Sequence, residues 1–320
     1  MPILETGATI LPPSDDRIFK LLLTHPDAKT VLMDVISALL DCEVLDVIVR
    51  NNEVPSTDTE EKMERFDVNT IVDGGKQVDI EMQASSVEEE PNGEHTNLKR
   101  KTMYYLTDLH SSQSSKGKAY DQLVQTYQAT FCTYTVFPQR AGFVNKFSMR
   151  TDDGYLFNED IQAIFIELSK LQGIVQKPVD EMTSIEMWSL FFRYADIPKY
   201  RDKVNEIIKA REAMEVATEL LASISQDEKE RAIYRSRRMF ITDMESNIRV
   251  AERRGEERGV IIGEERGIVI GKEQGMAIGE AKLENKLNTI AMNMKLNNMP
   301  AELISLITGL SVAVIDNLNV

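Results

Sequence analysis

Apolar residues near the start of the chain recur at helical spacing. A helix or a pair of helices is therefore predicted over residues 15–40, with a break at the proline-containing segment 25–27. Ser14 or Asp15 is suited to cap the first turn, because a short side-chain oxygen can accept hydrogen bonds from free backbone N–H groups. The apolar positions that define the first helix are Ile18, Phe19, Leu22 and Leu23.

Strand-like patterns follow. Residues 44–49 form a β-branched run, and residues 63–72 and 77–83 alternate between apolar and polar positions on either side of a glycine-containing turn. This arrangement predicts a short strand and then a β-hairpin. A helical pattern over 98–112 and a further strand within 121–137 complete an α/β core, since strands alternate with helices.

The pattern of apolar and polar positions changes at about residue 158. Residues 158–247 show apolar positions three and four apart, which predicts several amphipathic helices and no strand. The tail predicts three short helices at 290–296, 300–306 and 311–318. Between the last two, Gly309 provides a stop and Ser311 a new cap.

Glycine occupies every fourth position over 25 residues, between alternating charged and apolar triplets. On a helix such residues form one slowly drifting ridge, and each glycine costs about 1 kcal/mol relative to alanine. A partner helix packed closely on the ridge could offset this cost, so homo-oligomerisation is one interpretation; a flexible linker is the other. The glycines are Gly255, Gly259, Gly263, Gly267, Gly271, Gly275 and Gly279.

These patterns predict four regions. Residues 1–157 form an α/β core with a mixed sheet flanked by helices, and 158–250 form a helical region. Residues 251–282 form the glycine-repeat helix, and 283–320 form a small helical tail.

Composition narrows the class of protein. The chain has 320 residues, of which 42% are hydrophobic and 28% charged, as is ordinary for a globular protein. No apolar stretch is long enough for a membrane span, and the first residues do not resemble a signal peptide. Two cysteines fit a reducing compartment, so a cytoplasmic location is expected. Three scattered histidines make a His/Cys zinc site improbable.

Charge is distributed unevenly. The net charge of −15 argues against wholesale wrapping of nucleic acid. Residues 51–95 nevertheless contain thirteen acidic and three basic residues, whereas 96–150 contain eight basic and two acidic ones. An acidic site beside a basic segment suits phosphodiester chemistry, although charge also fluctuates along any chain.

Strand parity makes the hairpin prediction specific. Alternation places Glu81 and Gln83 on the polar face of the second strand. A two-residue loop would pair Asp67 with Met82, on the wrong face. A three-residue loop, Asp73-Gly74-Gly75, pairs Asp67 with Glu81 and brings two carboxylates together.

Two facing carboxylates repel each other, but they are suited to holding a hard divalent cation through oxygen. A metal-dependent hydrolase is therefore the leading hypothesis. The alternative is an amphipathic hairpin whose polar face is solvated.

The motifs resemble the PD-(D/E)XK nuclease superfamily, and more closely its recombination-promoting nuclease / transposase family. That family's Ile-Glu-Met-Gln motif corresponds to residues 80–83, and its Asp-x-x-Phe-Lys signature to residues 16–20. The resemblance extends over nearly the whole chain. Its later positions correspond to Arg100, Tyr104, Tyr105, Gln113, Gly117 and Tyr120.

The resemblance implies a PD-(D/E)XK core that cuts double-stranded DNA with Mg²⁺ or Mn²⁺, in recombination, transposition or phage defence. It implies that Asp67 and Glu81 hold the metal, with the Ile80 carbonyl as a further ligand. Asp16 would be an additional acidic group at the site. A helix-start carboxylate favoured by the helix dipole is the other interpretation of Asp16.

The chain departs from the superfamily at its lysine. Gln83 can orient water by hydrogen bonding, but it carries no positive charge. Lys20 or Lys99 could compensate from a neighbouring helix. Arg100 and Gln113 could contact phosphate or brace the site. The departure leaves a second hypothesis open, in which the fold binds DNA or assembles with little or no catalysis.

Overall fold

The computed structural model describes residue 4 and residues 9–50, 68–84, 95–114 and 119–318. The chain divides into two compact units, Met1–Arg238 and Met239–Val320. Within the described ranges, no helix is both long and apolar enough to cross a bilayer.

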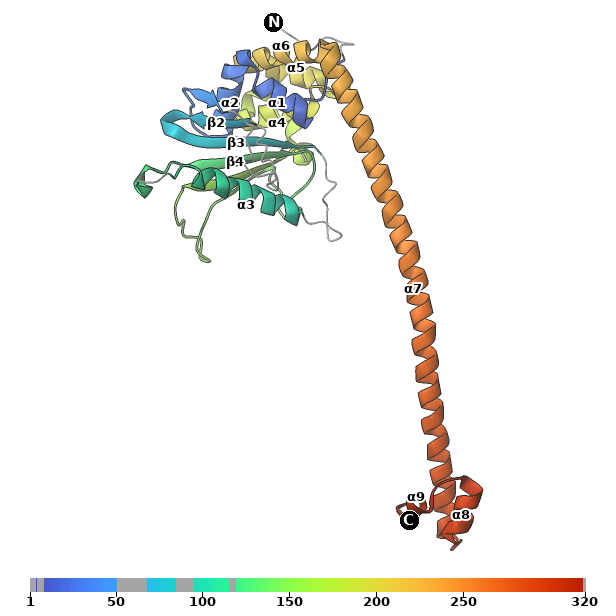
Figure 1. Ribbon diagram of the computed structural model, residues 1–320. Coiled ribbons are helices and arrows are strands. Elements are labelled where there is room, and N and C mark those ends of the chain that lie inside the picture. The colour runs from blue at the N-terminus through green and yellow to red at the C-terminus, as the bar shows by residue number, and fades with distance from the viewer. Residues whose placement is uncertain (1–3, 5–8, 51–67, 85–94, 115–118, 319–320) are drawn as a thin grey trace. The chain divides into compact units, whose positions relative to one another are not determined.

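The first unit contains a mixed sheet in the strand order β1-β2-β3-β4-β6-β5 (Figure 1). β3 and β4 pair in parallel, as do β4 and β6, whereas the other neighbours are antiparallel. The predicted α/β core with a mixed sheet is confirmed. The strands are β1 (Val47–Val49), β2 (Val68–Val72), β3 (Lys76–Gln83), β4 (Thr126–Cys132), β5 (Val144–Phe147) and β6 (Ile161–Glu167).

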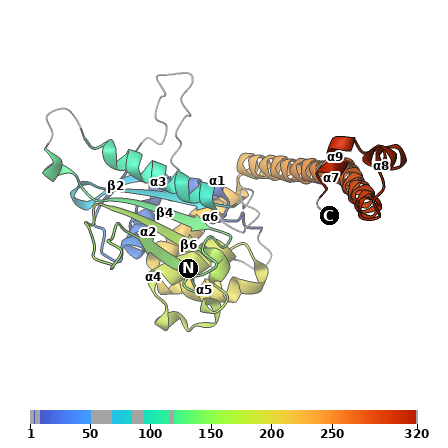
Figure 2. The same ribbon diagram turned by 90° about the horizontal axis from the view of Figure 1, so that it is seen from below.

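Helices cover both faces of this sheet. α3 packs on one face, and α1, α2 and α4 lie on the other, as two views of the ribbon agree (Figures 1 and 2). The predicted helix pair is confirmed, because α1 and α2 are separated at Pro26–Ala28. Asp15 caps α1 by accepting bonds from the backbone N–H groups of Arg17 and Ile18. The helices of this unit are α1 (Asp16–Leu23), α2 (Lys29–Leu40), α3 (Thr96–Ser111), α4 (Ser184–Tyr194), α5 (Arg201–Ala210) and α6 (Glu212–Gln226).

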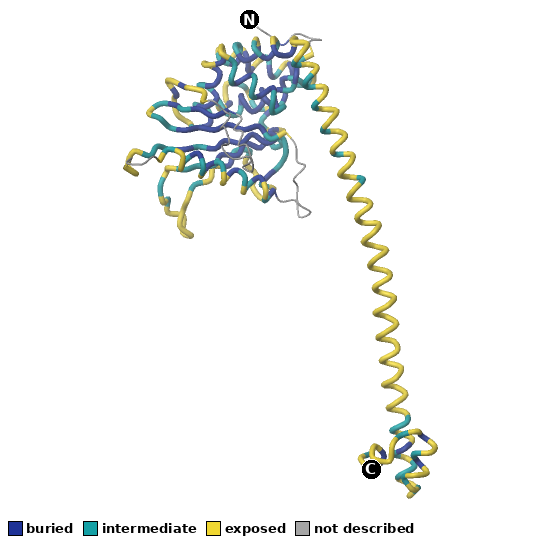
Figure 3. Tube along the Cα trace, in the orientation of Figure 1, coloured by how far each residue is buried: buried dark blue, intermediate teal, exposed yellow. Residues whose placement is uncertain are grey.

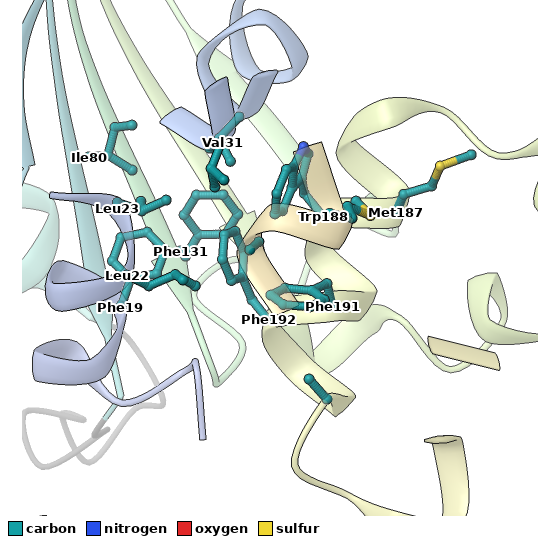
Figure 4. Close-up of a cluster of buried hydrophobic side chains, with 14 of the residues drawn as sticks. Phe19, Leu22, Leu23, Val31, Ile80, Phe131, Met187, Trp188, Phe191 and Phe192 are labelled. Atoms are coloured by element: carbon teal, nitrogen blue, oxygen red, sulfur yellow. The ribbon is translucent and has the colours of Figure 1, made fainter. Parts of the chain in front are cut away.

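One apolar core joins the sheet to the later helices. Phe19 of α1, Phe131 of β4 and Phe192 of α4 meet with ring centroids 5.1 to 5.6 Å apart (Figure 4). Trp188 stacks on Phe192 at 5.5 Å and donates its indole N–H to Asp34 at 2.8 Å. The helices after residue 158 thus complete the core of the sheet.

The prediction of no strand after residue 158 is wrong. β6 lies between β4 and β5 in the sheet, and its last four residues are buried. A strand covered on both faces is a nearly continuous apolar run, and its spacing cannot be distinguished from that of a buried helix.

α7 (Glu228–Leu296) begins in the first unit and continues into the second. Residues 255–279 lie within this helix, so they do not form the flexible linker considered from the sequence. The predicted helix at 290–296 is the end of α7 rather than a separate element. α8 (Ala301–Thr308) and α9 (Val312–Asp316) follow, with Gly309 in the left-handed region at φ 75° and Ser311 as the cap of α9.

Candidate functional site

The β2–β3 turn has the odd length that the site hypothesis required. Asp73–Gly75 connects the strands, so that Val72 pairs with Lys76 and Asn69 with Asp79. Gly74 and Gly75 have φ values of 70° and 91°, a conformation that glycine adopts without steric cost. The predicted register is therefore confirmed over the described part of the hairpin.

Asp67 lies outside the described residues, immediately before β2. The described register begins with the pair Val68–Ile80. The pairing of Asp67 with Glu81 remains a prediction.

The polar face of β3 is buried rather than solvated. Asp79 and Glu81 are 1% and 7% exposed, on the face of the sheet that α3 covers. Their partners in the neighbouring strand are Gln128 and Thr130, which are also buried. The alternative of a solvated face is wrong, and this polar layer lies inside the fold.

Glu81 uses its two carboxylate oxygens differently. Oε1 accepts hydrogen bonds from Lys101 Nζ and, at 2.7 Å, from Gln83 Nε2. Oε2 is buried and has no hydrogen-bond partner within the described residues. A buried, anionic oxygen with free lone pairs is the donor type that hard divalent cations prefer, so Glu81 fits an implied metal.

Other oxygens surround Glu81. Gln128 Nε2 donates to Asp79 Oδ2 at 2.7 Å, and the Gln128 Oε1 and Thr130 Oγ1 atoms lack partners in the described part of the chain. Ile80 directs its side chain into the opposite, apolar core (Figure 4). The described residues contain no cluster of three or more His, Cys, Asp or Glu side chains that could hold a metal. A complete site would therefore need a ligand such as Asp67.

Cys132 lies at the same end of the sheet, paired between Gln83 and Glu167. Burial raises the pKa of its thiol, and the negative charges of Glu167 and Glu81 raise it further, whereas Lys101 opposes them. Burial thus favours the neutral form of this thiol.

Lys101 was missed by the sequence analysis as a site residue. It lies on α3 next to the buried Thr102, and its Nζ is 5.7 Å from the centre of the Tyr105 ring. The helical period places Lys101 beside the buried face marked by Leu98, Thr102 and Leu106, but it does not indicate a contact with Glu81. The Glu81 cluster, meaning Glu81, Gln83 and Lys101, thus combines two strand residues with one helix residue.

The other predicted basic residues are dispersed. Lys99 Nζ lies 5.4 Å from the centre of the Phe137 ring, and Arg100 is exposed on α3. Lys20 is half-buried on α1, which packs on the opposite face of the sheet from α3. Neither Lys20 nor Lys99 is the lysine bonded to Glu81.

Gln113 braces the end of α3 against the start of β4. Its Oε1 accepts from the Val124 backbone N–H at 2.9 Å, and its Nε2 donates to the Val124 carbonyl at 3.0 Å and to Thr126 Oγ1 at 2.8 Å. Of the two roles considered, these contacts favour bracing.

Asp16 is held by α7. Both of its oxygens accept from Arg237 Nη2, at 2.9 and 2.6 Å. Within the described residues, no hydrogen bond or ion pair joins Asp16 to Glu81. The structure therefore does not bring Asp16 into the Glu81 cluster.

A family model described as PD-(D/E)XK nuclease family transposase matches residues 13–251 of the 320-residue chain. The match contains β2, β3, the Glu81 cluster and the whole sheet. No curated protein and no solved structure matches the chain.

Proposed function

We propose that this chain, which belongs to the PD-(D/E)XK nuclease family transposases, is an endonuclease. It would hydrolyse double-stranded DNA with Mg²⁺ or Mn²⁺. Its role would be in recombination, transposition or phage defence. Nucleases of this superfamily generally use divalent metals, and their substrate is DNA.

The observation that carries the proposal is the state of Glu81. Glu81 is 7% exposed, and one of its oxygens has no partner among the described residues. Burying such a carboxylate is costly unless a further partner, such as a metal ion, binds the free oxygen. The resemblance to the family's Ile-Glu-Met-Gln motif implies a metal ligand at this position of β3.

The metal would be held by Glu81, by Asp67, which precedes β2 in the sequence, and by the Ile80 carbonyl. When bound, a divalent cation lowers the pKa of a coordinated water and stabilises charge on phosphate oxygens. Gln83 fixes the orientation of Glu81 through their hydrogen bond. Lys99 and Arg100 extend positive charge along α3, where they would contact the DNA backbone.

A second candidate function is DNA binding or assembly without cleavage. It is favoured by Gln83, whose uncharged amide replaces the superfamily lysine and donates to Glu81 instead of carrying a positive charge.

We also propose that residues 255–279 mediate homo-oligomerisation. No described residue lies within 4 Å of the Cβ position at any glycine of this segment, so a second copy could approach its backbone closely.

Plasmid nicking tests the proposed function. The full chain should nick supercoiled DNA in Mg²⁺ and not in EDTA, and Glu81→Gln and Asp67→Asn should each reduce the rate at least 100-fold, on the order of other lost metal-site groups. Glu219→Gln, an exposed position on α6, is the matched control and should nick like the wild type. DNA binding without nicking under any divalent ion would favour the second candidate. If Glu81→Gln nicks DNA at the wild-type rate, Glu81 is not part of the catalytic site.

A further inference from the structure

Glu81 has two competing demands. Its Oε1 accepts from the Lys101 ammonium, and the proposed function requires the same carboxylate to bind a divalent cation. Two cations close to one buried carboxylate repel each other in a medium of low dielectric constant. It is therefore unfavourable for Glu81 to bind the Lys101 ammonium and a divalent cation at the same time.

We propose that Lys101 is an exchangeable cation: it neutralises Glu81 until a divalent metal binds there, and then contacts the DNA phosphate. Lys101 thereby supplies, from α3, the positive charge that Gln83 lacks. This inference rests on the proposed function and adds a residue and a coupling to it.

The surroundings of Lys101 suit such an exchange. The side chain of Glu81 is 10% exposed, whereas that of Lys101 is 36% exposed, so the ammonium is near solvent and the carboxylate is not. The Tyr105 ring, 5.7 Å from Nζ, offers the ammonium an attractive surface after it leaves Glu81. A lysine has a flexible four-carbon stem, which allows its charge to move while α3 stays in place.

Gln83 keeps the carboxylate in position during the exchange. Its Nε2 donates to the same Oε1 at 2.7 Å, so Glu81 retains one fixed bond when Lys101 departs. An uncharged amide does not repel a bound cation. Gln83 thus supplies the fixed hydrogen bond, and Lys101 supplies the charge that moves.

Metal binding gives the first readout, without any DNA or activity. Calorimetric titration of the full chain with Mn²⁺ should show Lys101→Met binding about tenfold more tightly than the wild type, the magnitude of one charge-assisted hydrogen bond. Lys99→Met removes the same charge two residues away, from a lysine over the Phe137 ring, and should change the Kd less than threefold. Equal or weaker Mn²⁺ binding by Lys101→Met would overturn the proposal.

DNA binding gives the second readout. With a fluorescent duplex, Lys101→Met should weaken binding about threefold to tenfold in Ca²⁺ and hardly at all in EDTA, because in EDTA the ammonium remains on Glu81. Lys99→Met should weaken binding equally in both buffers. An equal loss for Lys101→Met in both buffers would mean that Lys101 is an ordinary surface cation, and the exchange would be excluded.

Two further variants show whether a negative result comes from misfolding, from a wrong metal site or from a wrong assignment of the exchange. Lys101→Arg keeps the charge and should retain the wild-type Mn²⁺ affinity within threefold; tightening equal to that of Lys101→Met would show that charge is not the cause. Glu81→Gln should abolish Mn²⁺ binding with or without Lys101. If Glu81→Gln still binds Mn²⁺, the proposed metal site itself is wrong.

Discussion

Buried oxygens without partners lower stability, and the polar layer beneath α3 contains several of them. Thr130 is fully buried on β4, and its hydroxyl has no partner within the described residues. Thr70 on β2 is equally buried, but its hydroxyl donates to the Val78 carbonyl at 2.8 Å. These two threonines therefore form a matched pair, one with an unpaired hydroxyl among the described residues and one with a bonded hydroxyl.

Thr130→Val should stabilise the first unit by about 1 kcal/mol, because valine has the same shape and removes an unpaired buried hydroxyl. Thr70→Val should destabilise it by about 1 kcal/mol, because the buried hydrogen bond from the Thr70 hydroxyl to the Val78 carbonyl is lost. Urea unfolding with an unchanged m-value measures both. Equal destabilisation by the two substitutions would show that Thr130 has a bonding partner.

For single residues, the alternation of side chains along the two strands gave the sharpest test of the predicted hairpin. It made the site hypothesis depend on the three-residue turn and the Asn69–Asp79 pair, both of which the structure contains, because the side-chain period of a strand is two and one residue of slip reverses the faces. Lys101 was not predicted. Its contact with Glu81 depends on how α3 is placed over the sheet, which no local pattern determines.

At the scale of elements, α4 carries a complete capping box. The Thr183 hydroxyl accepts from the Glu186 N–H, and Glu186 Oε2 accepts from the Thr183 N–H at 2.7 Å and from Lys177 Nζ at 3.0 Å. Thr183→Ala should cost about 1 kcal/mol of stability. Because α4 supplies Trp188 and Phe192 to the core, urea unfolding of the whole first unit should report this loss.

The same box predicts a pH dependence. Burial alone would raise the pKa of Glu186, but the Thr183 N–H, the Lys177 ammonium and the Thr183 hydroxyl together lower it. A carboxyl whose pKa is lower in the folded state stabilises the fold above its unfolded pKa, about 4.3, and loses this contribution as the pH falls through its folded pKa. The stability difference between wild type and Glu186→Gln should therefore be constant from pH 6 to 8 and shrink below about pH 4. A difference that is the same at pH 3 and pH 7 would contradict this assignment.

Two ion pairs of opposite polarity join α1 to the start of α7. Arg17 donates to both oxygens of Glu230, at 2.9 and 2.8 Å, and Asp16 accepts from Arg237. Arg237→Asp should lower the thermal midpoint by a degree or two, since partly exposed pairs contribute about 0.5 to 1 kcal/mol. Asp16→Arg combined with Arg237→Asp should recover most of the loss. If it does not, the Asp16–Arg237 bond contributes nothing to the attachment of α7.

β6 shows why elements are harder to predict than registers. Its residues Ile164–Glu167 are buried because α3 and α4 cover opposite faces of the sheet, so the alternation that revealed β2 and β3 is lost. Whether such an apolar run is a strand is decided by its pairing with β4 and β5, which lie outside the run itself.

At the scale of the whole molecule, α7 changes character along its length. Near its start Tyr234 packs against the core, whereas residues 251–286 are exposed throughout (Figure 3). The seven glycines cost about 1 kcal/mol each, about 7 kcal/mol in sum, relative to alanine. Among the described residues, a Cβ atom at any of them would meet nothing within 4 Å. Close approach by another backbone, as proposed above, would give the glycine ridge a physical reason.

Substitution of the ridge separates a paired helix from a solitary one. Gly263→Ala, Gly267→Ala and Gly271→Ala together should raise helicity in either case, because alanine favours the helix. If a second copy packs on the ridge, the added methyl groups should also shift the light-scattering mass towards the monomer, whereas Gln274→Ala, beside the ridge, should leave it unchanged. Truncation before Gly255 should produce the monomer outright. Higher helicity with an unchanged mass in the triple variant, and an unchanged mass after truncation, would show that the helix is solitary and that its glycines need another explanation.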